Sequence, residues 1–159
     1  MAQSEVKKPN FTGKWVLEKT DNLDKFLSES EGWGWAMRKL AATAYVHQNI
    51  EHDTEKDRIR VRMTNPKNTV NYVATIGGDE FEFVDLSGTD IRAKFTWDEN
   101  NTILRMKALK FKLEKDNLRF IERWIDPEDG KMKIRTSNEE KKLSMVQIFK
   151  KESTVPDFS

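Results

Sequence analysis

Apolar and polar residues alternate along much of this 159-residue chain. The segment 91–97, IRAKFTW, places apolar residues at every odd position and polar residues at every even position. The same period places Ile59, Val61 and Met63 opposite three arginines, and it recurs from Val70 to Ile76. A period of two residues is that of a β-strand with one face toward a core. These segments therefore predict strands with apolar residues inside and basic residues facing water.

Turn-forming sequences separate the strand-like segments at intervals of about ten residues. Examples are NPKN at 65–68, GGD at 77–79, LSGTD at 86–90 and DPEDG at 126–130. With a first strand at 11–18 and a last strand at 143–151, the chain has room for about ten strands. We predict an all-β fold, a ten-stranded antiparallel up-and-down β-barrel, because closure removes the exposed edges of an open sheet. A barrel of this size can enclose a small ligand.

Two short segments between the first and second strands have helical spacing instead. Leu23, Phe26 and Leu27 follow i, i+3, i+4 spacing after Asp21, which we expect to cap the first helix. A second stripe, at i, i+4, i+7 and i+11, consists of Trp33, Met37, Leu40 and Ala44. Helices this short are unstable alone, so tertiary contacts must hold their apolar stripes. We expect a helix-turn-helix lid over one open end of the barrel.

Composition excludes several classes of protein. The absence of cysteine excludes disulfides, thiolate zinc sites and cysteine nucleophiles. Lys and Arg number 28 against 27 Asp and Glu, so no net field attracts nucleic acid. No 18-residue apolar run and no apolar N-terminal leader are present, so we expect a cytoplasmic protein, with nuclear delivery left open. An apolar content of 36% is low for a packed core and favours a sheet around a partly hydrated cavity.

Catalytic motifs are missing from the sequence. His47 and His52 would lie on opposite faces of a regular strand, which is poor geometry for a shared metal ion. The chain contains no G-x-S-x-G elbow, no phosphate-binding loop and no H-E-x-x-H motif. We therefore expect neither an enzyme nor a protein with a cofactor or a metal site.

The N-terminal segment NFTGKWVLEKTDNLDKFL resembles that of the intracellular lipid-binding proteins, the family of fatty-acid-binding and cellular retinoid-binding proteins. The similarity continues in GWGWAMRKLA, NTVNYVATIGGDEF and VQIFKK, with a departure at Leu23, where the family usually has an aromatic residue. The resemblance implies a calycin-like barrel at residues 10–152, between tails at 1–9 and 153–159. It also implies that the lid covers a ligand portal, with Trp33 and Trp35 either bordering the ligand route or closing the barrel end.

The family resemblance implies non-catalytic binding and transport of a long-chain hydrophobic ligand, in the first place a fatty acid or another acyl lipid. Two alternatives stay open: a carrier of an uncharged ligand such as retinol, and a protein-interaction module with a collapsed cavity. The carrier would be a monomer. Its lid residues Lys25, Arg38 and Lys39 would be available for transient contact with an anionic membrane, or would form an ordinary solvated face.

The ligand class depends on the polar anchor, since a buried carboxylate needs a cation or several hydrogen bonds. Many fatty-acid binders of the family carry Arg-x-Tyr in the last strand, and the matching positions here are Gln147 and Phe149. The same pair resembles the retinol-binding branch. Gln147 can donate and accept hydrogen bonds, so it suits an alcohol, an amide or a protonated acid.

The family's second cationic position aligns with Glu122, beside Arg123. The even positions of 118–124 are the more apolar, which would turn Glu122 inward and leave Arg123 an ordinary surface arginine, whereas a bulge would turn Arg123 inward. The apolar face of 102–113 changes phase, so Arg105 and Lys107 enter the cavity if the later face is the inner one, and stay in solvent if a bulge separates the halves. The other expected lining residues are Trp15, Leu17, Ile50, Tyr72, Phe95, Trp97, Met132, Ile134 and Met145, with Trp33, Trp35 and Met37 of the lid.

Overall fold

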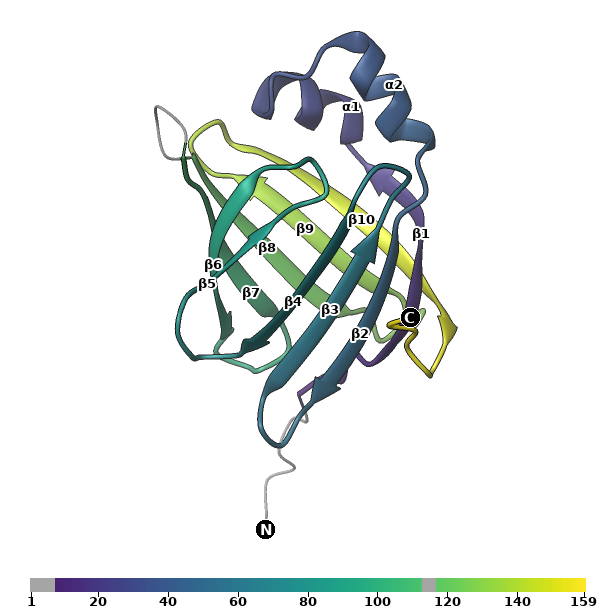
Figure 1. The fold of residues 1–159 in the computed structure, drawn as a ribbon, viewed down its shortest axis with the longest axis vertical. Coiled ribbons are helices and arrows are strands. Elements are labelled where there is room, and N and C mark those ends of the chain that lie inside the picture. Colours follow the sequence, from purple (N-terminus) through teal and green to yellow (C-terminus); the bar gives the residue numbers. More distant parts are fainter. Residues whose placement is uncertain (1–7, 113–116) are drawn as a thin grey trace.

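The computed structural model describes residues 8–112 and 117–159. Ten antiparallel strands form one sheet in the order β4-β3-β2-β1-β10-β9-β8-β7-β6-β5. They are β1 (Gly13–Asp21), β2 (His47–Asp53), β3 (Arg58–Thr64), β4 (Thr69–Thr75), β5 (Phe81–Val84), β6 (Asp90–Trp97), β7 (Leu104–Lys110), β8 (Asn117–Ile125), β9 (Met132–Asn138) and β10 (Leu143–Ser153). Pairing of β1 with β10 curls this meander into a nearly closed barrel, with β4 and β5 as the unbonded edges (Figure 1). The predicted ten-stranded barrel is confirmed.

Alternation places the predicted apolar faces inside the barrel. In β3, β4 and β6 the buried residues are Ile59, Val61, Val70, Tyr72, Ala74, Ile91, Ala93 and Phe95. The residues between them are exposed or half-buried. In these three strands the apolar residues are concentrated on the inner face, which accounts in part for the low apolar content of the chain.

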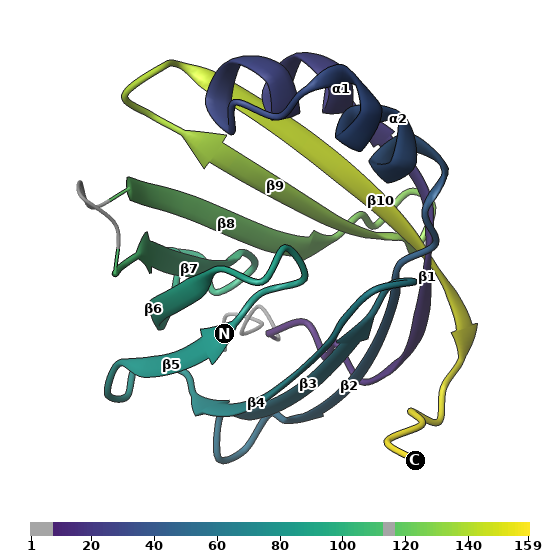
Figure 2. The same cartoon turned by 45° about the horizontal axis from the view of Figure 1, so that its top comes forward.

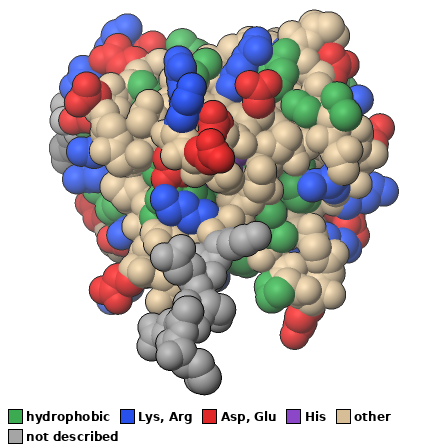
Figure 3. Space-filling view, turned by 90° about the horizontal axis from the view of Figure 1, so that it is seen from below, with side chains coloured by type: hydrophobic (Ala, Val, Ile, Leu, Met, Phe, Trp, Pro, Cys, Tyr) green, Lys and Arg blue, Asp and Glu red, His purple; other side chains and the backbone are tan. Residues whose placement is uncertain are grey.

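One end of the barrel, which we call the base, is closed by stacked rings. The Phe11 ring stacks on His52 and Trp97, with centroid distances of 5.7 and 6.2 Å. Asp57 accepts hydrogen bonds of 2.8 Å from Trp97 Nε1 and from Lys8 Nζ. Figure 3 views this end, where acidic and basic side chains are interspersed around the described part of the surface. The base is therefore held by both aromatic packing and hydrogen bonds.

The opposite end, the mouth, lies under a helical lid (Figures 1 and 2). The lid consists of α1 (Leu23–Lys25), a π-helical turn η1 (Phe26–Ser30) and α2 (Trp35–Thr43). It connects β1 to β2, so the predicted position of the lid is confirmed. None of the helices in the described ranges combines the length and the apolar character that a membrane span requires.

Two details predicted for the lid are wrong. Asp21 does not cap the first helix, because β1 continues through Asp21, which pairs with Val146, and α1 follows Asn22 at φ 63° without a side-chain cap. The predicted stripe meets the cavity only at its two ends, since Trp33 and Ala44 line it, whereas Met37 and Leu40 are 43% and 56% exposed. No residue of α2 is buried, and its Ala41, together with Ala44 directly after the helix, lines the cavity.

Candidate functional site: a cavity under the lid

A cavity of about 510 Å³ lies inside the barrel and reaches the lid. Small-molecule sites commonly measure about 300–1,000 Å³. Its apolar wall comes from both the lid and the strands and includes Leu17, Phe26, Leu27, Val46, Met63, Ile91, Met106, Ile121, Ile134 and Met145. The barrel interior is therefore hollow, as carriage of a hydrophobic ligand requires.

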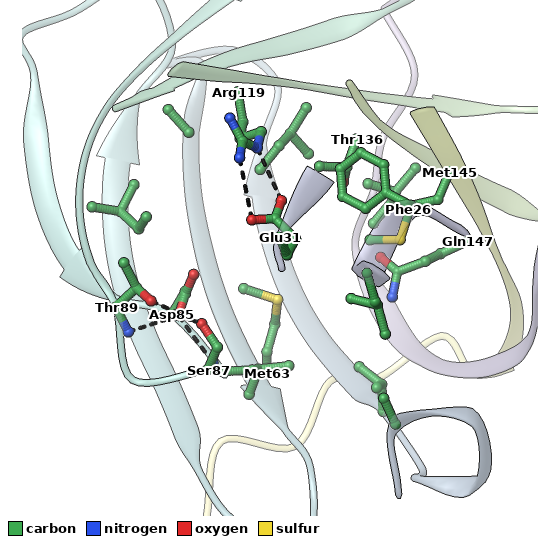
Figure 4. A pocket seen from close by; sticks show the side chains of 18 of the residues that line it. Phe26, Glu31, Met63, Asp85, Ser87, Thr89, Arg119, Thr136, Met145 and Gln147 are labelled. Atoms are coloured by element: carbon green, nitrogen blue, oxygen red, sulfur yellow. Dashed lines mark hydrogen bonds and ion pairs between the residues drawn. The ribbon is translucent and has the colours of Figure 1, made fainter. Parts of the chain in front are cut away.

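The mouth of the cavity is bordered by two turns and the lid. Asn65 lies in the turn between β3 and β4, and residues 85–89 lie in the turn between β5 and β6. Asn68 Nδ2 donates a 2.7 Å hydrogen bond to the Leu86 carbonyl and joins the two turns. Figure 4 shows Asp85, Ser87 and Thr89 bonded to one another along this part of the wall.

A buried arginine, Arg123 of β8, reaches into the cavity and is only 4% exposed. Its NH1 donates a 2.7 Å hydrogen bond to Gln48 Oε1 and lies 3.4 Å from Met132 Sδ. No carboxylate of residues 8–112 and 117–159 forms an ion pair with it. Burial lowers the pKa of the Arg123 guanidinium, although an arginine keeps its proton in proteins. Arg123 is thus a buried positive charge with a neutral partner.

Tyr72 of β4 also lines the cavity, and its hydroxyl is buried without a hydrogen-bond partner among the described residues. Burial raises the pKa of this hydroxyl, so it remains protonated at neutral pH, although the nearby charge of Arg123 opposes the rise. An unpaired buried hydroxyl is costly, typically by about 1–3 kcal/mol. Arg123 and Tyr72 therefore leave donors for an anionic or polar ligand group.

A second cationic cluster lines the same cavity beside the lid. Arg119 is 5% exposed, and it holds Glu31 with Nε to Oε1 at 2.9 Å and NH2 to Oε2 at 3.2 Å (Figure 4). Lys110 Nζ donates to Oε2 of the same carboxylate. Burial opposes ionisation of Glu31, but the hydrogen bonds from Arg119 and Lys110 outweigh it and hold the pKa of Glu31 below its ordinary value.

The orientation predicted for β8 is wrong. Arg119, Ile121 and Arg123 line the cavity, so Glu122 faces outward, where its carboxylate lies 3.8 Å from Arg135 NH1. The pairing of β8 has no register shift, so Arg123 turns inward without a bulge. The prediction failed because the apolar even positions of β8 face outward and are covered by arginine side chains. One example is Arg105, whose Cζ lies 4.0 Å from the Phe120 ring centroid.

Neither interpretation of segment 102–113 holds in full. The inner face of β7 is Leu104, Met106, Ala108 and Lys110, with no register shift against β6 or β8. Arg105 and Lys107 therefore face outward, as expected for the solvent alternative but without its bulge. The last predicted strand residue, Leu113, lies outside the described residues.

The other sequence-predicted site residues divide into three groups. Those that line the cavity are Trp33, Tyr72, Ile134, Met145 and Gln147. Those that are packed in the core or at the base are Trp15, Ile50, Phe95, Trp97, Met132 and Phe149. Trp35 and Met37 are exposed on α2, 67% and 43% respectively. Gln147 thus occupies a position from which it could contact a ligand, whereas Phe149 does not.

Sequence reasoning missed several polar residues of the cavity, among them Glu31, Gln48, Lys110 and Arg119. A signal existed in β8, since Arg119 and Arg123 are four residues apart and share one face of a strand. No comparable pattern distinguishes Gln48 or Glu31, because their partners lie 75 and 88 residues away. No group of three or more metal-binding side chains occurs within the two described ranges.

Comparisons with known proteins agree with this arrangement. No family model matches the sequence. Cellular retinoic acid-binding protein 1 of Hippocampus comes is 30% identical over 103 residues, 64% of this chain and 72% of that protein. Fatty acid-binding protein homolog 4 of Caenorhabditis elegans is 31% identical over 94 residues, 59% of this chain and 63% of that protein. The solved structure of As-p18, an extracellular fatty acid binding protein, has a TM-score of 0.76 at 21% identity, over 92% of this chain and 99% of that one.

The ten-stranded barrel with a hollow interior and a helical lid is a calycin fold, the fold of that solved structure. The chain belongs to the intracellular lipid-binding protein family, as its N-terminal resemblance implied.

Proposed function

We propose that this protein is a non-catalytic carrier that binds a long-chain hydrophobic carboxylate, such as a fatty acid, in the barrel cavity. The observation that carries the proposal is Arg123, a buried cation that faces an otherwise largely apolar cavity and has no carboxylate partner among the described residues. The guanidinium fork suits a carboxylate, and such charge-assisted hydrogen bonds are stronger than neutral ones. The named relatives and the neighbouring structure are described as binding retinoic acid or fatty acids, which supports the same ligand chemistry.

The two ends of such a ligand would have different roles. Burial of an acyl chain stabilises the complex by about 0.8 kcal/mol per methylene, so about fifteen methylenes contribute roughly 12 kcal/mol before the costs of association. The headgroup then decides the ligand class. Arg123 would bind the carboxylate, and the Tyr72 hydroxyl would donate a hydrogen bond to it.

The direct test is displacement of a fluorescent fatty acid, 11-(dansylamino)undecanoic acid, from the delipidated protein by oleate, retinoic acid and retinol. Displacement by oleate or retinoic acid but not by retinol is the expected result. Displacement by retinol alone would support the uncharged-ligand alternative. Absence of any uptake would support an interaction module, which the open cavity disfavours.

The variant Arg123→Met tests the anchor. It should weaken oleate binding by about 1.5–3 kcal/mol, roughly 10- to 150-fold, and leave binding of oleyl alcohol much less affected. Arg135→Met is the matched control, since Arg135 lies on the outside of the adjacent strand β9. Equal oleate affinity in both variants would remove Arg123 from the anchor role.

A second candidate, carriage of an uncharged ligand, rests on Gln147, which lines the cavity from β10 (Figure 4). If an alcohol headgroup contacts Gln147, the variant Gln147→Leu should weaken retinol binding by about 1–3 kcal/mol while sparing oleate. Unchanged affinity for both ligands would exclude Gln147 as a headgroup contact.

Ligand exchange at a membrane is supported by the exposed face of α2. Trp35 and Leu40 are 67% and 56% exposed, and Lys39 Nζ lies 5.7 Å from the Trp35 ring centroid. Arg38 contributes less than expected, because its Nε is bonded to Asp24 at 2.8 Å. The double variant Trp35→Ser with Leu40→Ser should transfer a bound fluorescent fatty acid more slowly to phosphatidylserine vesicles than wild type does, with unchanged ligand affinity. Equal transfer rates would rule out this contact.

We further propose a cytoplasmic monomer. The placement in the cytoplasm rests on the absence of cysteine, which suits a reducing compartment. Sedimentation of the purified protein and fractionation of cells that express it would test the two statements separately.

A further inference from the structure

The Glu31 cluster has the geometry of an occupied carboxylate site. Arg119 binds both oxygens of the Glu31 side chain, and Lys110 approaches one of them. Paired donors of this kind are the arrangement that proteins use to recognise carboxylates. The carboxylate here belongs to the residue that directly follows η1 in the lid, while both cations belong to barrel strands.

The cluster shares a cavity with Arg123 but lies at another depth. Arg119 and Arg123 are on the same inner face of β8, four residues apart, so their backbones are separated by about 13 Å along the strand. Arg123 lies toward the base, 6.0 Å from the Phe11 ring, and Arg119 lies against the lid. The cavity therefore has two cationic positions, and only the deeper one lacks an anion among the described residues.

We propose that Arg119 and Lys110 form a second carboxylate-binding position in the cavity, and that Glu31 fills this position and closes it to ligands. The effect of this filled position on ligand selectivity rests on the proposed function. A ligand bound at Arg123 finds no vacant cation at the lid, so the protein selects chains with one charged end. Removal of Glu31 would open the second position to α,ω-dicarboxylates.

Small carboxylates test the position without any hydrophobic ligand. We compare the melting temperatures of wild type, Glu31→Ala and Glu29→Ala in sodium acetate and in sodium chloride of equal concentration. Glu29 is the control, because it lies two residues away on the exposed side of the same segment and pairs with Lys25 at 3.9 Å. In 100 mM acetate, Glu31→Ala should melt about 3–6 °C higher than in chloride if the position binds acetate with a Kd of about 10 mM.

Wild type and Glu29→Ala should respond equally to the two salts. The same response in all three proteins would overturn the proposal. If Glu31→Ala does not fold in chloride, its refolding in acetate is the equivalent measurement, and recovery in acetate but not in chloride supports the site. Failure to refold in either salt, together with no acetate response of the better-packed variant Glu31→Gln, would count against it.

Ligand selectivity provides the second test. Hexadecanoate and hexadecanedioate compete against the dansyl fatty acid in wild type, Glu31→Ala and the double variant Glu31→Ala with Arg119→Met. The ratio of affinities should move toward the diacid by at least about tenfold in Glu31→Ala, the effect of one added charge-assisted contact, and return in the double variant. A ratio that stays within about twofold of wild type in Glu31→Ala would overturn the selectivity role.

The two tests separate this inference from the proposed function. Acetate rescue of Glu31→Ala without uptake of hexadecanoate by wild type would support the second position and reject fatty-acid carriage. Uptake of hexadecanoate by wild type, without acetate rescue of Glu31→Ala and without a change in selectivity, would support fatty-acid carriage and reject the second position.

Discussion

The base and the mouth of the barrel are built from different kinds of contact. At the base, Phe11 and Trp15 are fully buried, and Asp57 accepts hydrogen bonds from three neighbouring side chains. At the mouth, no residue of α2 is buried, and Trp35 is 67% exposed. Local stability follows the density of buried contacts, so the base should open only with global unfolding, while α2 can move in the folded protein. The structure thus separates the part that maintains the fold from the part that borders the mouth of the cavity.

Replacement of a tryptophan in each region gives the largest expected contrast. Trp15→Ala should lower the free energy of unfolding by about 3–5 kcal/mol, because it leaves a cavity and removes the Nε1 hydrogen bond to the Phe11 carbonyl. Trp35→Ala should change it by no more than about 0.5 kcal/mol. Urea denaturation of both variants measures the difference, and similar losses in the two would refute the separation of roles.

Loss of the charge at Asp57 should have the next largest effect. Asp57→Asn weakens the hydrogen bonds from Lys8, Trp97 and His52, and we expect a loss of about 1–3 kcal/mol in unfolding free energy. Glu55→Gln is the control, because Glu55 is exposed in the same turn. If the two variants were equally stable, the hydrogen bonds at the base would contribute little.

Acidification should also act at the base first. Burial lowers the pKa of His52, although hydrogen bonding to Asp57 opposes the shift and the nearby charges of Asp53 and Lys8 act in opposite directions. The unfolded chain therefore binds a proton at a higher pH than the folded protein does. Stability should fall as the pH drops below about 6.5, by at most ~1.4 kcal/mol per pH unit for one proton.

Thermal melting between pH 7 and 5 would measure this effect. His52→Gln should lose the slope, and His47→Gln, in which the half-buried ring beside Tyr45 is replaced, should keep it. The Asp57 carboxylate adds a second loss at lower pH. Burial alone would raise its pKa, but hydrogen bonds from Lys8, Trp97 and His52 lower it, so its contribution disappears as the pH falls through that lowered value.

The smallest effect is expected for the hydrogen bond between the two turns of the mouth. Asn68→Ala removes the 2.7 Å bond to the Leu86 carbonyl at an exposed site, and should lower the unfolding free energy by no more than about 0.5 kcal/mol. Amide hydrogen exchange of the turn at residues 85–89 should nevertheless become faster. Unchanged exchange in this turn would mean that the bond does not restrain the mouth.

The predictable part of the fold followed from regular alternation. In β6, Ile91, Ala93 and Phe95 are buried as expected, because a strand that has one apolar and one charged face can be placed on a core in only one way. The lid was predictable for a similar reason, since Leu23, Phe26 and Leu27 break the two-residue period. Its details were not: Ala41 and Ala44 face the cavity, while the larger Met37 and Leu40 face solvent.

The candidate site was less predictable. It departs from the rule that apolar residues face the barrel interior and polar residues face water, on which the prediction of the barrel relied. The inner face of β8 carries Arg119 and Arg123, whereas its outer face carries Phe120 and Trp124. An assignment by hydrophobicity therefore turns the strand the wrong way round. In β8 the charged side chains face the cavity, and the aromatic rings lie outside beneath arginine side chains. This is the reverse of the usual distribution of polar and apolar residues.

The sequence by itself determined the strands, their antiparallel order, the place of the lid and the family, since these depend on local periodicity, turn residues and a contiguous N-terminal motif. Only the tertiary structure decided which charges enter the cavity and which of them are neutralised. Arg119 meets Glu31 from 88 residues away, and Arg123 meets Gln48 from 75 residues away. A buried charge needs a hydrogen-bonding or ion-pairing partner, and here distant segments supply it. A local sequence pattern does not show whether such a partner is present.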